Sequence, residues 1–162
     1  MGFQLTQKEQ LLLKDQLSHE KVCIEKYANY AEQAQDPQLK QLFTQYGSHE
    51  QQHYNTIDQL LQGQQVNVQG GQGQQAGQGA SRKAQQSSGG QGRAGMTMQS
   101  DAMLCNDMLM TEKHVSGTYD TAIFESVNPN IRQALQHIQK EEQQHGEGIF
   151  NYMHRHGMYD PQ

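Results

Sequence analysis

The sequence predicts an all-helical protein, a four-helix bundle built from two antiparallel helical hairpins that are joined by a long linker. Three observations support this prediction. Apolar residues recur at spacings of three and four, no stretch alternates at period two for long enough to form a strand, and the two halves of the chain repeat each other. Because a hairpin of two amphipathic helices cannot bury its apolar stripes alone, we expect the two hairpins to pack together.

The repeat relates the two halves by an ungapped shift of 92 residues, which brings Glu20 onto Glu112. The positions of the first half that are identical to their partners 92 residues later are Leu12, Asp15, Leu17, Glu20, Lys21, Tyr27, Pro37, Gln41, Glu50, Gln51, Gln52, His53 and Ile57. Chance does not readily produce so many identities in one register. Each half is therefore interpreted as one copy of the same supersecondary unit.

The first hairpin is expected over residues 5–62. One apolar stripe runs from Leu13 to Ala31 and a second runs from Leu39 to Leu61. Asp36 and Pro37 break the pattern between the two stripes, and a capping residue followed by proline is typical of a helix start.

The second hairpin is expected over residues 101–157. Its stripes run from Leu109 to Ile123 and from Ile131 to Tyr152. Asn128 and Pro129 lie between them, at the same place in the repeat as the break in the first hairpin. We therefore expect Asn128 to cap the fourth helix.

Residues 63–100 are predicted to be a flexible linker. They consist mainly of Gly, Gln and Ser, and such a segment cannot offset the entropy of ordering by burying apolar groups. A glycine-rich coil of nearly forty residues spans roughly 35 Å, about the length of a 25-residue helix. It can therefore cross the whole bundle and pair the hairpins antiparallel, as in ferritin-like folds. An exchange of hairpins between two chains also remains open.

The composition excludes several classes of function. A formal net charge of -5 gives no basic surface for nucleic acid or anionic lipid, so neither partner is expected. No apolar run is long enough for a membrane span or a signal peptide. The two cysteines, Cys23 and Cys105, do not make a disulfide framework, and we expect both to be buried thiols in a protein made in a reducing compartment.

Six polar residues interrupt the apolar stripes. They are Glu20, Glu50, His53, Glu112, Glu142 and His145. Each ionised carboxylate in a protein core costs several kcal/mol unless it is compensated. Two divalent cations would balance the four carboxylates and leave the two imidazoles as neutral ligands.

The positions of the glutamates predict that all four lie in one layer. Glu20 and Glu50 are equally far in sequence from the first turn, as Glu112 and Glu142 are from the second. One Glu from each of two helices and an E-x-x-H from each of the other two is the ligand set of ferritin-like di-iron and di-manganese proteins. We therefore expect two Fe or Mn ions bridged by Glu50 and Glu142, although Zn binds the same types of ligand.

The stretch HEQQH at residues 49–53 also matches the H-E-x-x-H motif of zinc proteases. The repeat argues against this interpretation, because it replaces His49 with Glu141 and the residues after His53 provide no third ligand. We expect Glu141 to accept a hydrogen bond from a metal-bound histidine of a neighbouring helix, and His49 to play a similar part.

Tyr27 and Tyr119 lie two helical turns after Glu20 and Glu112, on the same faces. They are candidates for hydrogen-bond donors to the site or redox-active phenols, and packing in the core is an equal alternative. No residue is assigned a catalytic role.

The C-terminal half contains a KHVSGTY segment at 113–119, the Asn128-Pro129 break, an EEQQH segment at 141–145 and an M-x-x-x-G-x-Y ending at 153–159. With these motifs, residues 104–161 resemble the coat F family of endospore-forming bacteria. The resemblance implies a ferritin-like bundle located in the spore coat among other coat proteins, synthesised in the mother-cell cytoplasm. Members of that family commonly lack a complete set of metal ligands, whereas this chain has one.

Two main functions follow from these expectations. In the first, the chain is a coat protein, expected to form homo-oligomers, whose dimetal site stabilises the bundle. In the alternative, the site is a manganese-catalase-like or rubrerythrin-like centre that acts on peroxide or O2 and protects the spore. Iron storage is a third, weaker alternative, and a vestigial site without metal is a fourth.

Overall fold

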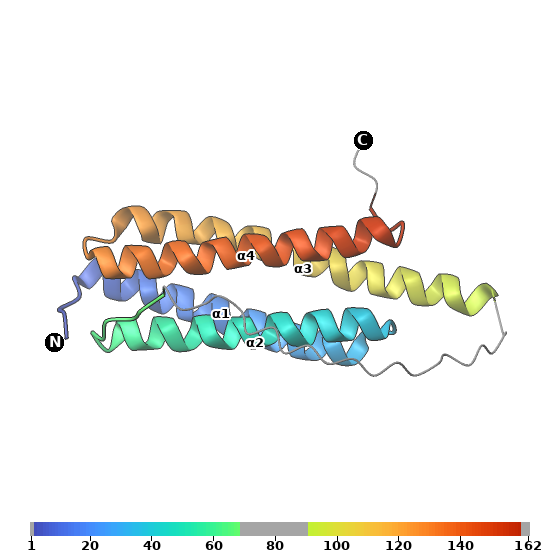
Figure 1. The fold of residues 1–162 in the computed structure, drawn as a ribbon, viewed down its shortest axis with the longest axis horizontal. Helices are drawn as coiled ribbons and strands as arrows, with labels where there is room; N and C mark the ends of the chain where they lie inside the picture. Colours follow the sequence, from blue (N-terminus) through green and yellow to red (C-terminus); the bar gives the residue numbers. More distant parts are fainter. Residues whose placement is uncertain (1, 69–90, 160–162) are drawn as a thin grey trace.

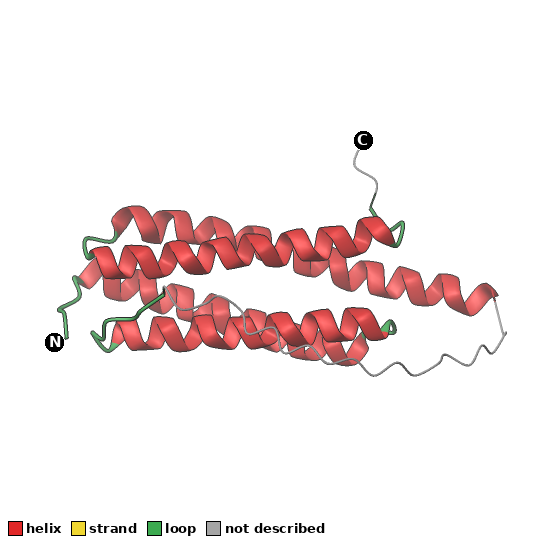
Figure 2. Cartoon of the chain, in the orientation of Figure 1, coloured by secondary structure: helices red, strands yellow, loops and turns green. Residues whose placement is uncertain are grey.

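The computed structural model describes residues 2–68 and 91–159, with side chains for 2–68 and 99–159. These ranges form four long helices and no strand (Figures 1 and 2). The helices are α1 (Gln7–Gln33), α2 (Pro37–Leu61), α3 (Gln91–Glu125) and α4 (Pro129–Arg155). The prediction of an all-α bundle of two hairpins is confirmed. None of the described helices is both long enough and apolar enough to cross a membrane.

The helices pair as the repeat requires. α1 packs along α2 and α3 packs along α4, while α1 also contacts α3 and α2 contacts α4. α1 and α4 run in one direction and α2 and α3 in the other, so the two hairpins pack antiparallel (Figure 1). The end of α2 and the start of α3 lie at opposite ends of the bundle, as a long crossover requires.

The expected linker, residues 63–100, is wrong at its C-terminal boundary. α3 begins at Gln91 rather than near residue 101, and its first turns project beyond the other helices (Figure 1). At the other boundary, the backbone N–H of Val66 donates to Asn130 Oδ1 at 3.1 Å, and Asn130 Nδ2 donates to the Val66 carbonyl at 2.9 Å. The linker thus begins docked against α4. Residues 69–90 of the expected linker lie outside the described residues.

Side-chain caps define the helix starts. Thr6 and Glu9 form a capping box at the start of α1. Asp36 accepts a hydrogen bond from the backbone N–H of Gln38, and Asn128 accepts one from that of Asn130. The caps expected at the two turns are therefore confirmed, each followed by a proline in the first helical turn.

Each hairpin has one buried carboxylate that binds the turn of the other hairpin. Glu9 Oε1 accepts hydrogen bonds from the backbone N–H groups of residues 127 and 128, at 2.8 and 3.0 Å. Asp101, the repeat partner of Glu9, accepts from the backbone N–H groups of residues 35 and 36, at 2.8 and 2.9 Å. These turn residues precede the helices, so the carboxylates satisfy backbone donors that have no helical acceptor.

Apolar side chains fill the bundle in two clusters, one on each side of the glutamate layer. One cluster includes Leu13, Ile57 and Leu135, and the other includes Phe43 and Ile149. The two cysteines are buried and free, as expected, and they belong to different clusters.

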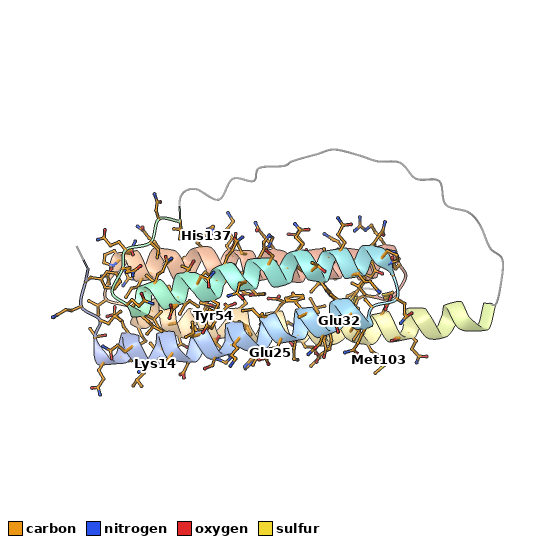
Figure 3. All side chains as sticks on the ribbon, turned by 90° about the horizontal axis from the view of Figure 1, so that it is seen from below. Lys14, Glu25, Glu32, Tyr54, Met103 and His137 are labelled. Atoms are coloured by element: carbon orange, nitrogen blue, oxygen red, sulfur yellow. The ribbon has the colours of Figure 1, made fainter. Side chains whose placement is uncertain are left out.

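Replacing Glu9 with Ala should lower the free energy of unfolding by about 2–3 kcal/mol, because two partly buried backbone donors lose a charged acceptor. Urea denaturation in the presence of a chelator measures this change. Lys14→Ala is the control, since Lys14 lies on the same helix and is exposed (Figure 3). A loss no larger than that of the control would contradict the role of Glu9.

The same carboxylate predicts a pH dependence. Burial raises the pKa of Glu9, but hydrogen bonds from the backbone N–H groups of Asn128, Thr6 and Val127 lower it by more, so the pKa lies below 4.5. A carboxyl with a depressed pKa contributes stability above its unfolded-state pKa, and this stability is lost as the pH falls. The wild type should therefore lose more stability on acidification below pH 4.5 than Glu9→Gln does.

Candidate metal centre

The structure brings together all six residues that the sequence predicts as metal ligands. α1 provides Glu20, α2 provides Glu50 and His53, α3 provides Glu112, and α4 provides Glu142 and His145. None of them is more than 2% exposed. The E-x-x-H spacing places Glu50 and His53, like Glu142 and His145, on one face of their helix, one turn apart.

The six residues form two overlapping groups. Glu20, Glu50, His53 and Glu142 make one group, and Glu50, Glu112, Glu142 and His145 make the other. In each group, the candidate ligand atoms all lie within 4.8 Å of one another. Because the groups share Glu50 and Glu142, the site has the form of two adjacent cation positions joined by two carboxylates.

Both histidines direct Nδ1 toward the carboxylates. His53 Nδ1 lies 3.1 Å from Glu50 Oε2 and 3.3 Å from Glu142 Oε1. His145 Nδ1 lies 3.1 Å from Glu50 Oε1 and 3.4 Å from Glu112 Oε1. One imidazole from each half of the repeat thus contacts the shared carboxylates, His53 from the first half and His145 from the second.

The other ring nitrogens contact the two residues that the repeat equates. His53 Nε2 lies 2.6 Å from Glu141 Oε2, and His145 Nε2 lies 3.0 Å from His49 Nδ1. An ionised carboxylate only accepts hydrogen bonds, so the proton of neutral His53 resides on Nε2 and its Nδ1 presents a lone pair to the site. His137 Nε2 lies 3.4 Å from Glu141 Oε1 and extends this chain of contacts.

The two buried tyrosines each bind a carboxylate of the opposite hairpin. Tyr27 Oη donates a hydrogen bond to Glu112, and Tyr119 Oη donates one to Glu20. Burial, followed by the nearby carboxylates, raises the pKa of both phenols well above 10, so they remain protonated donors. Their contacts hold the two unshared carboxylates in place.

Several carboxylate oxygens at the site accept no hydrogen bond from the described residues. These are Glu20 Oε2, Glu112 Oε2 and both oxygens of Glu142. An unsatisfied buried polar group costs about 1–3 kcal/mol, and a charged group costs more. Metal coordination satisfies such oxygens, so the donor set fits a metal centre.

The cluster attracts positive charge. Burial raises the pKa of Glu50 to about 7, although hydrogen bonds from His145 and His53 oppose the shift. Burial, together with the neighbouring Glu112, raises the pKa of Glu142 well above its usual value. Burial lowers the pKa of His145, but hydrogen bonds to Glu112 and Glu50 raise it to about 9. Protons and metal cations therefore compete for the same atoms.

One half of the site carries a contact that the repeat does not share. The ring of Tyr46 stacks on His145 with the centroids 4.3 Å apart, and its hydroxyl occupies the space beside Gly148. A Cβ at position 148 would lie 1.7 Å from Tyr46 Oη. In the repeat, Tyr46 corresponds to Ile138, and Gly148 corresponds to Thr56. A glycine inside a helix, at a position where the other half has Thr, is the sequence signal that could have indicated this contact.

A pocket of about 200 Å³ between α3 and α4 reaches the site. Its lining residues are Leu109, Glu112, Lys113, Ser116, Glu142, Gln143 and Gly146. A larger pocket of about 530 Å³ lies between α1 and α2, and none of the six candidate ligands lines it. Of these two pockets, only the smaller one is lined by candidate metal ligands.

Comparison with known proteins finds a family similarity for the second hairpin. Residues 100–162 match the sequence model of a family described as the Coat F domain. The match includes α4 and the part of α3 that carries Glu112, and it supports the resemblance found in the sequence. No curated protein and no solved structure matches the chain.

Replacing Gly148 with Ala should destabilise the protein by about 1–3 kcal/mol, because the added Cβ must displace the Tyr46 ring from His145. Gly117→Ala is the control, since a Cβ there meets nothing within 4 Å. That substitution should stabilise the helix by about 0.5–1 kcal/mol. Urea denaturation of both variants measures the difference, and equal effects would contradict the contact.

Proposed function

We propose that the bundle holds two divalent metal ions in a carboxylate-bridged centre, in a protein of the spore coat. The observation that carries the centre is the pair of four-residue groups that share Glu50 and Glu142. The remaining ligands, Glu20 with His53 and Glu112 with His145, divide between the two ions. Fe and Mn suit this set of oxygen and imidazole ligands, and Zn binds the same types of donor.

The charge balance supports this proposal. Four ionised carboxylates and two divalent cations sum to zero when both imidazoles are neutral ligands. The contact with Glu141 places the proton of a neutral His53 on Nε2, away from the site. The ions would bind ligands from all four helices and so hold the two hairpins together. Because they bind only the folded protein, they raise its stability in proportion to the logarithm of their free concentration.

The location in the spore coat rests on the Coat F domain match over residues 100–162. In this function the bundle is a building block that associates with copies of itself and with other coat proteins. Fractionation of purified spores, with an antibody against this chain, tests the location. Recovery in the soluble core fraction instead of the coat extract would contradict it.

A dimetal enzyme acting on peroxide or O2 is the second candidate, and the pocket that reaches Glu112 and Glu142 favours it. A purely structural site needs no opening. Bound Fe or Mn would supply the redox chemistry. Tyr27 and Tyr119 would hold Glu112 and Glu20 in position, and the neighbouring apolar clusters would limit the entry of water.

Metal analysis tests the centre directly. Protein purified from cells grown with Fe and Mn should contain about two metal ions per chain, and a Glu50→Ala, Glu142→Ala double variant should contain almost none. The control is Glu25→Ala, Glu32→Ala, which removes the same charge from exposed positions on α1 (Figure 3). No metal in the wild type, or equal metal in the Glu50/Glu142 variant, would overturn the proposal.

Peroxide consumption separates the two candidates. If the centre is an enzyme, the loaded wild type should remove hydrogen peroxide at a rate proportional to its metal content, and the Glu50/Glu142 variant should not. Absorbance at a peroxide-sensitive wavelength follows the reaction. Two bound metals without peroxide or O2 consumption would favour the structural function.

A further inference from the structure

Two of the candidate metal ligands line the pocket between α3 and α4. Glu112 and Glu142 line it, and they carry three of the unpartnered buried oxygens, namely Glu112 Oε2 and both oxygens of Glu142. Lys113 and Gln143, which also line the pocket, are exposed. The pocket thus leads from solvent to two of the residues that would bind metal.

The repeat provides an internal comparison for this pocket. A second pocket, of about 260 Å³, is lined by Lys21, Ile24, Glu25, Gln51 and Tyr54. It occupies the equivalent place between α1 and α2, because a shift of 92 residues turns Lys21 and Gln51 into Lys113 and Gln143. Neither Glu20 nor Glu50 lines it, so it ends before it reaches the carboxylates.

Two replacements account for this difference. Ile24 and Tyr54 line the closed pocket where the open pocket has Ser116 and Gly146. Tyr54 lies on α2 and lines the closed pocket together with Ile24 of α1, whereas the equivalent Gly146 has no side chain that could fill the open pocket. The asymmetry therefore comes from side-chain size at two equivalent positions.

The inner end of the open pocket is narrow. Glu112 and Glu142 are only 1% and 0% exposed, and Leu109 Cδ1 lies 3.8 Å from the point where a Cβ at position 146 would be. Rotation of a half-buried leucine is a fast motion, and the absence of a side chain on Gly146 leaves room for it. Such an opening favours small molecules over large ones.

We propose that small solutes such as peroxide, dioxygen or azide reach the metal centre through the pocket between α3 and α4, and that Ile24 and Tyr54 close the equivalent path between α1 and α2. This inference rests on the proposed metal centre and specifies how that centre is reached. The positive charge of Lys113 at the entrance favours anions over cations.

Azide binding to the iron-loaded full-length protein tests the path. A Ser116→Ile, Gly146→Tyr variant copies the closed side onto the open side, and its azide association, followed by stopped-flow absorbance, should be at least about tenfold slower. The matched control, Ile24→Val, Tyr54→Phe, changes the equivalent positions and should leave the rate within about twofold of the wild type. Metal content should be unchanged in both.

A second variant avoids dependence on the packing of a large side chain. Gly146→Cys protein is loaded with iron and then modified with a bulky thiol reagent, while the native cysteines, at 0% exposure, stay unmodified. Modification of the cysteine at position 146 should slow azide binding to the metal centre. Modification of Tyr54→Cys with the same reagent should leave the rate of azide binding unchanged.

The results distinguish the two proposals. A wild type that binds no metal ion overturns the metal centre itself. A wild type with two irons, whose azide rate is unaffected by blocking at position 146, overturns the path and leaves the metal centre intact. If the double variant does not fold, the modified Gly146→Cys protein decides.

Discussion

Four carboxylates in the core of a narrow bundle impose the constraint on which the other features depend. Such a layer repels itself unless positive charge enters it or protons neutralise it. The surrounding contacts are arranged to accept cations: both imidazoles turn Nδ1 inward, Glu141 and His49 hold the outer nitrogens, and two phenols bind the unshared carboxylates. The polar layer also separates the apolar core into two clusters, so a vacant, ionised site would weaken the middle of the bundle.

Much of this arrangement could be predicted from sequence. The helical stripes, the two proline-containing turns and the six candidate ligands depend on spacing along the chain, and the repeat supplies a second copy that separates signal from chance. The start of α3 at Gln91 could not be predicted, because Gly92 and Gly95 continue the composition of the linker and only the adjoining helix indicates otherwise. The composition of a segment indicates how much entropy is lost when the segment becomes ordered. It does not indicate whether an adjoining helix will extend into the segment.

The contacts that sequence reasoning missed are those made between the hairpins. Glu9 and Asp101 are equivalent in the repeat but differ in residue type, and each acts on a turn that belongs to the other hairpin. The stacking of Tyr46 on His145 beside Gly148 breaks the repeat altogether. Such features depend on which surfaces meet in three dimensions, and periodicity within one helix carries no information about that.

The reciprocal bonds of Glu9 and Asp101 have the form of an isologous interface. A residue of the first hairpin contacts the second hairpin's turn, and its counterpart returns the same contact, as two identical subunits do around a twofold axis. Tyr27 and Tyr119 follow the same rule. Two copies of a single hairpin could make this whole set of contacts, and the family match spans only one hairpin. Gene duplication and fusion of a self-pairing hairpin would therefore be sufficient to produce this chain.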